Sequence, residues 1–158
     1  MRLTIAQLNT TIGAIDANRV AIDRAIERAK SEESDLILFP ELALCGYPPE
    51  DLLFEDDFLT SLEEHLERLL PTTCGIAAVI GTVRRENGRL YNSAAVIDDG
   101  KLIGFYDKWR LPTYDVFNEW RYFTPGTRAP TWHLADTKVG IAICEDIWEG
   151  EYDRDPLD

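Results

Sequence analysis

The sequence has little histidine, cysteine and positive charge. Among 158 residues there are two histidines, three cysteines and 16 basic residues against 29 acidic ones, which gives a net charge of −13. Nucleic acid is therefore not an expected partner, because phosphate binding requires a basic surface. The cysteines are widely spaced and form no CxxC pair, which argues against a disulfide framework or a zinc site. Two scattered histidines argue against any other metal centre.

Long apolar runs are also missing. No run approaches the roughly 18 residues that span a bilayer, and the N-terminal stretch MRLTIAQLNTTIG is too short and too polar for a signal peptide. We therefore expect a cytoplasmic protein with no membrane partner. The composition, 45% apolar and 10% aromatic, is that of a folded globular protein. The length predicts one domain over residues 1–158, with nothing to bury in its tail at 149–158.

The hydrophobic pattern predicts strands and helices in alternation through the first half. Strands are expected at residues 3–8 and 35–39, the second of them buried on both faces, with a helix capped by Asp16 between them. A leucine-striped helix is expected over residues 58–70, with His65 on its charged side. This βαβ beginning indicates an α/β fold with a partly parallel sheet.

The second half has the alternation of a β-meander. Strands are expected, in chain order, at residues 76–84, 90–97, 101–106, 131–134 and 139–143. Asn87-Gly88 is typical of a type I′ turn between the first two. Residues 107–126 form a polar and aromatic loop that is longer than compact domains usually keep without a function, so this loop is a candidate site.

Three of these strands are followed by residues that can carry chemistry. Glu41 follows the strand at 35–39, Lys108 follows the strand at 101–106, and Cys144 ends the apolar run at 139–143. Strand ends are where α/β proteins place reacting groups. If these three strand ends converge, the carboxylate of Glu41 can take the proton of the Cys144 thiol, and the ammonium of Lys108 can stabilise an oxyanion. Each residue also has a structural explanation: a small buried thiol, a carboxylate capping a strand, or a lysine solvated at the sheet rim.

The motifs around these residues, FPE, DK and CED, resemble the three signatures of the nitrilase or carbon-nitrogen hydrolase superfamily. Their order and spacing match, and the resemblance covers residues 3–148. It implies an αββα sandwich that hydrolyses non-peptide carbon-nitrogen bonds, with Glu41 as base, Lys108 near the oxyanion and Cys144 as the nucleophile that carries the acyl group. Glu119 matches a second glutamate of the superfamily, which orients the lysine.

A narrower resemblance is carried by FPELALCGYPPEDLLF, YDKWRLPTYDVFNEWRYFTPG and ICEDIW, which look like the glutaminase domain of glutamine-dependent NAD synthetases. Such domains release ammonia from glutamine for a synthetase domain. The resemblance implies a glutamine pocket formed by Tyr47, Tyr114, Glu145 and Trp148. An acidic group beside the thiol also suits a substrate α-ammonium. Packing of the two tyrosines against the sheet is the alternative interpretation.

Nitrilase domains run well beyond the cysteine, so the resemblance implies only the N-terminal portion of the sandwich, incomplete at its C-terminus. Uncovered sheet edges then predict a homo-oligomer or a partly molten chain. The sequence shows no Gly-rich phosphate loop. The resemblance accordingly implies no cofactor for the glutaminase step, and ATP and deamido-NAD only for a synthetase domain or subunit, which is the expected partner. There are two alternatives to a glutaminase. The chain could be another amidase of the superfamily, or a non-catalytic fragment that acts as an interaction module.

Overall fold

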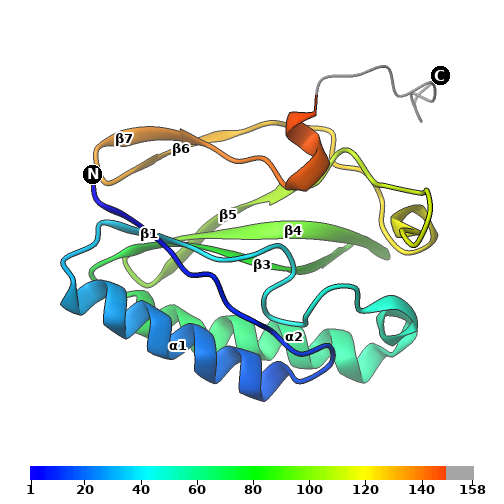
Figure 1. Ribbon diagram of the computed structural model, residues 1–158, viewed down its shortest axis with the longest axis horizontal. Helices are drawn as coiled ribbons and strands as arrows, with labels where there is room; N and C mark the ends of the chain where they lie inside the picture. The colour runs from blue at the N-terminus through cyan, green and yellow to red at the C-terminus, as the bar shows by residue number, and fades with distance from the viewer. Residues whose placement is uncertain (149–158) are drawn as a thin grey trace.

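Within residues 1–148, which the computed structural model describes, two α-helices, a five-stranded sheet and a two-stranded hairpin lie in three layers (Figure 1). The expectation for the tail at 149–158 lies outside the described residues. The main elements are β1 (Leu3–Ile5), α1 (Ile15–Ser31), β2 (Leu36–Leu38), α2 (Asp56–Leu69), β3 (Ala77–Glu86), β4 (Arg89–Asp98), β5 (Lys101–Asp107), β6 (Thr131–Leu134) and β7 (Thr137–Gly140). Short 3-10 helices are η1 (Glu50–Phe54), η2 (Leu70–Thr73), η3 (Glu119–Arg121) and η4 (Cys144–Ile147).

The large sheet has the order β1-β2-β3-β4-β5. Its first two pairings are parallel, as the βαβ pattern predicts, and the other two are antiparallel. Asn87 and Gly88 both have positive φ at the turn between β3 and β4, which is the conformation that a type I′ turn requires. The sheet is therefore mixed, and the predicted meander of β3, β4 and β5 is confirmed.

Helices α1 and α2 cover one face of the sheet (Figure 1). Alternate strand residues point toward them, and those on the three central strands are buried with the apolar stripes of both helices. The strand residues of this core include Ile37, Ala78, Ile80, Ala95 and Ile97. This layer is the main hydrophobic core of the described chain.

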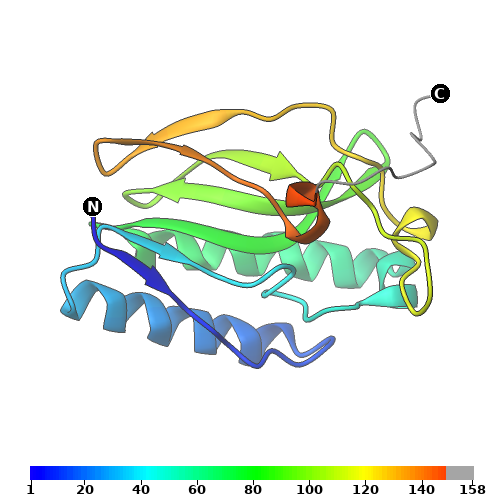
Figure 2. The ribbon, with the colours of Figure 1, turned by 45° about the horizontal axis from the view of Figure 1, so that its top comes forward.

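The hairpin of β6 and β7 covers the opposite face (Figure 2). Leu134 of the hairpin is buried with Val79, Val96 and Tyr106 of the sheet. The described residues thus supply three of the four layers of the expected sandwich, namely helices, sheet and part of a second sheet. Neither α-helix of this part of the chain combines the length and apolar composition of a membrane span.

Two expectations about the helices were wrong. Helix α1 begins at Ile15 with Ala14 as its N-cap, so Asp16 lies in the first turn and does not cap the helix. Asp16 instead accepts a hydrogen bond of 2.9 Å from Nε2 of His65. His65 is 6% exposed and lies on the packed face of α2, because it is three residues beyond Leu62 on the same stripe. The imidazole therefore bridges the two helices.

Strand lengths also differ from the expectation. β1 ends at Ile5, and Leu38 of β2 is 36% exposed, so β2 is not buried on both faces. β7 covers Thr137–Gly140, and its residues alternate between exposed and half-buried instead of forming a buried strand. Among the described residues β7 pairs with β6 alone, so one of its sides has no neighbouring strand. The chain leaves the hairpin after Gly140 and reaches Cys144 at the start of η4.

Candidate active site

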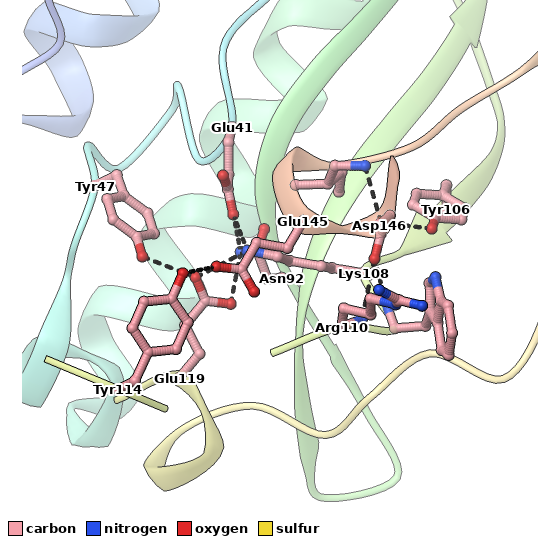
Figure 3. A network of polar contacts seen from close by, with 12 residues as sticks. Glu41, Tyr47, Asn92, Tyr106, Lys108, Arg110, Tyr114, Glu119, Glu145 and Asp146 are labelled. Atoms are coloured by element: carbon pink, nitrogen blue, oxygen red, sulfur yellow. Dashed lines mark hydrogen bonds and ion pairs between the residues drawn. The ribbon is translucent and has the colours of Figure 1, made fainter. Parts of the chain in front are cut away.

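The side chain of Lys108 lies at the centre of a buried polar network (Figure 3). Its Nζ donates to Oε1 of Glu41 at 2.7 Å and to Oε1 of Glu119 at 3.0 Å. Lys108 directly follows β5, Glu41 lies in the loop after β2, and Glu119 begins η3 within the long loop. Lys108 is 1% exposed, so its charge is balanced by these carboxylates and not by water.

Asn92 is a member of this network that the sequence patterns did not identify. It is fully buried on β4, and its Nδ2 donates to Oε1 of Glu41 at 2.6 Å and to Oε2 of Glu119 at 3.4 Å. Its main-chain oxygen accepts the amide of Lys108 at 2.8 Å. The available signal was an amide side chain in the middle of a predicted strand, because such a group is seldom buried without a hydrogen-bond partner.

Burial and neighbouring charges have opposite effects on the pKa values of Lys108 and Glu119. Burial disfavours the charged form of Lys108, but Glu41 and Glu119 outweigh it and raise the pKa of the ammonium above its ordinary value. Burial also raises the pKa of Glu119, while Lys108 lowers it. Lys108 is therefore a permanent cation at neutral pH, held between two carboxyl groups.

Cys144 is the first residue of η4, and its φ of 50° lies in the left-handed region, which is uncommon for residues other than glycine. It lines one cavity with Phe39, Pro40, Glu41 and Gly81. Burial and the charge of Glu41 raise the pKa of the thiol, whereas Lys108 and the backbone N–H of Glu145 lower it. The structure therefore brings Cys144, Glu41 and Lys108 together at one end of the sheet.

The residues expected to bind substrate surround this network. The Tyr47 hydroxyl donates to Oε1 of Glu119 at 2.8 Å, and the Tyr114 hydroxyl donates to Glu145 (Figure 3). Phe117 contacts both tyrosine rings, with centroid distances of 6.4 Å to Tyr47 and 5.6 Å to Tyr114. The tyrosines thus use their hydroxyls toward the site and their rings against the long loop.

Glu145 and Trp148 differ in exposure. Glu145 is 2% exposed beneath Tyr114, whereas Trp148 is 52% exposed at the end of η4. The carbonyl oxygen of Trp148 accepts a bond of 2.6 Å from Arg110. The structure therefore places the Glu145 carboxylate inside the site, whereas it leaves the Trp148 side chain exposed just after η4.

A metal ion is not needed to explain the acidic cluster. Within residues 1–148, no group of three or more histidine, cysteine, aspartate or glutamate side chains is arranged to hold one. The ammonium of Lys108 already occupies the position between the two glutamates. All three cysteines are free thiols, with Cys45 buried and Cys74 and Cys144 exposed.

A thiol with a carboxylate and an ammonium beside it, on a layered α/β fold, is an arrangement suited to acyl transfer on a cysteine nucleophile. A family model described as carbon-nitrogen hydrolase matches residues 2–155. The chain belongs to the carbon-nitrogen hydrolase family.

Two curated relatives within this family carry the same name. The glutamine-dependent NAD(+) synthetase of Synechocystis sp. is 43% identical over 159 residues, covering 94% of this chain and 28% of that protein. The enzyme of the same name from Thermotoga maritima is 41% identical over 150 residues, covering 94% of this chain and 26% of that protein. The chain therefore spans between a quarter and a third of the length of these relatives.

Solved structures agree on the fold. The glutamine-dependent NAD+ synthetase of Acinetobacter baumannii superimposes with a TM-score of 0.83 at 38% identity, covering 92% of this chain and 28% of that one. An amidase of the nitrilase superfamily from Nesterenkonia AN1 gives a TM-score of 0.82 at 24% identity, covering 92% of this chain and 56% of that one. The second likeness concerns the fold alone. The predicted α/β fold, as a portion of the nitrilase sandwich, is confirmed.

Proposed function

We propose that this chain hydrolyses the side-chain amide of glutamine and releases ammonia through a thioester on Cys144. The observation that carries the proposal is the placement of Lys108 between Glu41 and Glu119 while Cys144 and Glu41 line one cavity. The named activity of relatives at 43% and 41% identity supports glutamine as the amide. Tyr47, Tyr114, Glu145 and Trp148 are its proposed binding residues.

Glu41 is the proposed base, and the geometry suggests which of its oxygens acts. Lys108 and Asn92 both donate to Oε1 of Glu41, so Oε2 keeps its lone pairs for the thiol proton. The raised pKa of Cys144 makes a base necessary, because the thiol carries its proton at neutral pH. Glu41 therefore takes this proton as the sulfur attacks.

The reaction has two halves. The sulfur of Cys144 bonds to the amide carbon, and the oxyanion that forms is stabilised by the ammonium of Lys108. The carbon-nitrogen bond then breaks, Glu41 returns its proton to the leaving nitrogen, and ammonia departs. Water, deprotonated by Glu41, attacks the thioester, and glutamate leaves as the thiol is restored. Glu119 is the proposed positioning residue for Lys108.

Glutamine is recognised in this proposal by groups at both ends of the network. The buried carboxylate of Glu145 would pair with the α-ammonium of the substrate, because a carboxylate is the group that forms charge-assisted hydrogen bonds with an ammonium. Tyr114 already donates to that carboxylate and so fixes its direction. The exposed ring of Trp148 would cover the bound amino acid.

The ammonia is proposed to serve NAD synthesis in the cytoplasm. Its acceptor would be a synthetase domain or subunit that binds ATP and deamido-NAD, while the glutaminase step itself uses no cofactor. The similarity to NAD synthetases supports this destination.

The test is a glutaminase assay with matched cysteine variants. Ammonia and glutamate should form in equal amounts from glutamine, Cys144→Ala should abolish both, and Cys74→Ala, which removes another exposed thiol, should leave them unchanged. Faster hydrolysis of another amide would identify a different amidase of the family. Absence of turnover with every amide, in this chain and in a longer one that continues it, would favour a non-catalytic module.

A further inference from the structure

The carboxylate of Asp146 accepts hydrogen bonds from two separate segments of the chain. Its Oδ1 accepts the backbone amides of Trp109 at 3.3 Å and Arg110 at 3.0 Å. Its Oδ2 accepts the Tyr106 hydroxyl at 2.6 Å and the backbone amide of Ile143 at 2.9 Å. Figure 3 shows Asp146 between η4 and the end of β5. One half-buried side chain thus joins η4 to residues 106–110 by three bonds and closes its own turn by a fourth.

These segments carry two of the reacting groups. Ile143 immediately precedes Cys144, and Trp109 immediately follows Lys108. Asp146 therefore connects the main chain beside the thiol to the main chain beside the ammonium. Asp146 is the last residue of the CED motif, in which Cys144 is the proposed nucleophile and Glu145 a proposed binding residue.

The backbone around Cys144 depends on such a restraint. Its φ of 50° costs conformational energy that neighbouring contacts must offset. In this turn the backbone N–H of Glu145 is directed at the sulfur of Cys144. η4 is only four residues long and cannot hold its own geometry through helical bonds alone. The bond from the amide of Ile143 to Asp146 closes the turn.

We propose that Asp146 is a positioning residue that fixes Cys144 relative to Lys108 by holding η4 against the end of β5. The role rests on the proposed function, since it concerns the same nucleophile. It also predicts the reactivity of the thiol without any substrate.

The chemistry of the four contacts requires a carboxylate. Every partner is a donor, and an ionised carboxylate is the side chain that only accepts. Burial and the bond to Asp146 raise the pKa of Tyr106, so its hydroxyl keeps the proton that it donates. Asparagine has the same shape but replaces one oxygen with an amino group, which would face the amide of Ile143 or those of Trp109 and Arg110. Asp146→Asn is therefore the sharpest variant.

The experiment measures the rate at which iodoacetamide alkylates each cysteine of the 158-residue chain, followed by peptide mass spectrometry from neutral to alkaline pH. Asp146→Asn should slow alkylation of Cys144 by about tenfold or more, because a thiol displaced from Glu41 loses the base that takes its proton. Its pH profile should also differ from that of the parent, because burial, Glu41, Lys108 and the Glu145 N–H all act on the pKa of the thiol at its present position. Cys74 in the same sample should react at an unchanged rate.

Two further variants separate positioning from general stability. Tyr106→Phe removes one of the four donors and should give an intermediate loss of Cys144 reactivity with a folded chain. Asp57→Asn removes an equal charge on the exposed side of α2 and should change nothing at Cys144. If Asp146→Asn does not fold, the alkylation rate of Cys144 in Tyr106→Phe alone decides whether Asp146 positions the thiol.

The proposal is overturned if folded Asp146→Asn or Tyr106→Phe alkylates at Cys144 with the parent's rate and pH profile. The positioning role of Asp146 is supported if the alkylation rate of Cys144 falls in these variants, even when the parent chain hydrolyses no glutamine. In that case only the glutaminase proposal fails. Where the parent does hydrolyse glutamine, kcat should fall with the alkylation rate while KM changes little.

Discussion

At the scale of single residues, Lys108 is the cation that makes two carboxyl groups tolerable in one place, the buried Glu119 and the half-buried Glu41. Its Nζ lies 2.7 Å from Glu41 and 3.0 Å from Glu119. Removing one partner of a buried ionic group leaves the other charges uncompensated, which costs more than the net contribution of the pair. The structure thus gives Lys108 a role in stability beside its proposed role in catalysis.

Lys108→Met should lower the free energy of unfolding by about 3–5 kcal/mol at neutral pH. Methionine preserves the apolar stem but not the charge, so Glu41 and Glu119 repel each other without a cation. Urea unfolding measures the loss. Lys138→Met, which removes a charge from an exposed position of β7, should cost much less. Equal losses in the two variants would contradict this role of Lys108.

The pH dependence of the Lys108→Met variant has a definite sign. Burial raises the pKa of Glu119 and Lys108 lowers it, so removing Lys108 raises that pKa further. A carboxyl group whose folded pKa exceeds its unfolded pKa adds stability at low pH and loses it as pH rises through the folded pKa. The deficit of the variant relative to the parent should therefore shrink as the pH falls below neutral.

Most residues of the polar network could be predicted from the sequence, but not all of them. Glu41, Lys108 and Cys144 could be identified because each follows a predicted strand, and strand ends meet at one edge. Asn92 could not be placed this way, since it lies within β4 and only the folded chain shows that its amide faces Glu41. His65 was misplaced because its burial depends on the partner Asp16, which lies on another helix.

At the scale of elements, the predicted order of helices and strands is confirmed. The residues at which the strands begin and end differ from the prediction. Local patterns determine the type of an element, but its length depends on neighbours. β7 ends at Gly140 although apolar residues continue to Ile143, because the chain must leave β6 to bring Cys144 toward Lys108. The sequence could not indicate that departure, since it depends on a contact between distant segments.

Gly81 shows how one strand positions the loop that carries Glu41. A Cβ at Gly81 would lie 2.5 Å from the Leu42 nitrogen and 2.9 Å from the carbonyl carbon of Glu41, and would also clash with the Pro40 oxygen. The main chain of the loop therefore rests directly on β3. Leu44 donates its amide to the Gly81 oxygen at 3.0 Å and completes the contact.

Gly81→Ala should destabilise the protein by about 1–3 kcal/mol, the usual cost of overpacking, and should displace Glu41 from the cavity. The measurements are urea unfolding and the alkylation rate of Cys144, which Glu41 influences. Gly140→Ala is the matched control, because the nearest atom to its added Cβ, Thr131 Cγ2, is 4.0 Å away. A Gly81→Ala protein as stable and as reactive as Gly140→Ala would show that the loop is not held this way.

At the scale of the whole molecule, the second face of the sheet is covered unevenly. The register places Leu3, Ile5 and Leu38 on the same face as Leu36 and Val79. The β6–β7 hairpin buries the latter two, but Leu3, Ile5 and Leu38 remain 45%, 67% and 36% exposed. These three side chains, here named the β1–β2 strip, lie beside the edge of β1 that pairs with no other strand of residues 1–148.

The β1–β2 strip predicts that this chain self-associates. An apolar side chain contributes about 1.5–3 kcal/mol when it moves from water into an apolar contact, and an unpaired edge strand offers hydrogen bonds beside it. Ile5→Lys combined with Leu38→Lys should therefore reduce the sedimentation coefficient at a given concentration, because lysine at these positions opposes association.

The control must be another exposed apolar residue outside the strip, and Val116, which is 77% exposed in the long loop, provides it. Val116→Lys should leave the sedimentation of the parent unchanged, since general surface hydrophobicity is not what drives the association. A parent chain that sediments as a compact monomer at every concentration would contradict self-association. Dye binding to that monomer, with weak near-ultraviolet circular dichroism, would then show a loosely packed face. A cooperative monomer without dye binding would mean that the three side chains are tolerated in water.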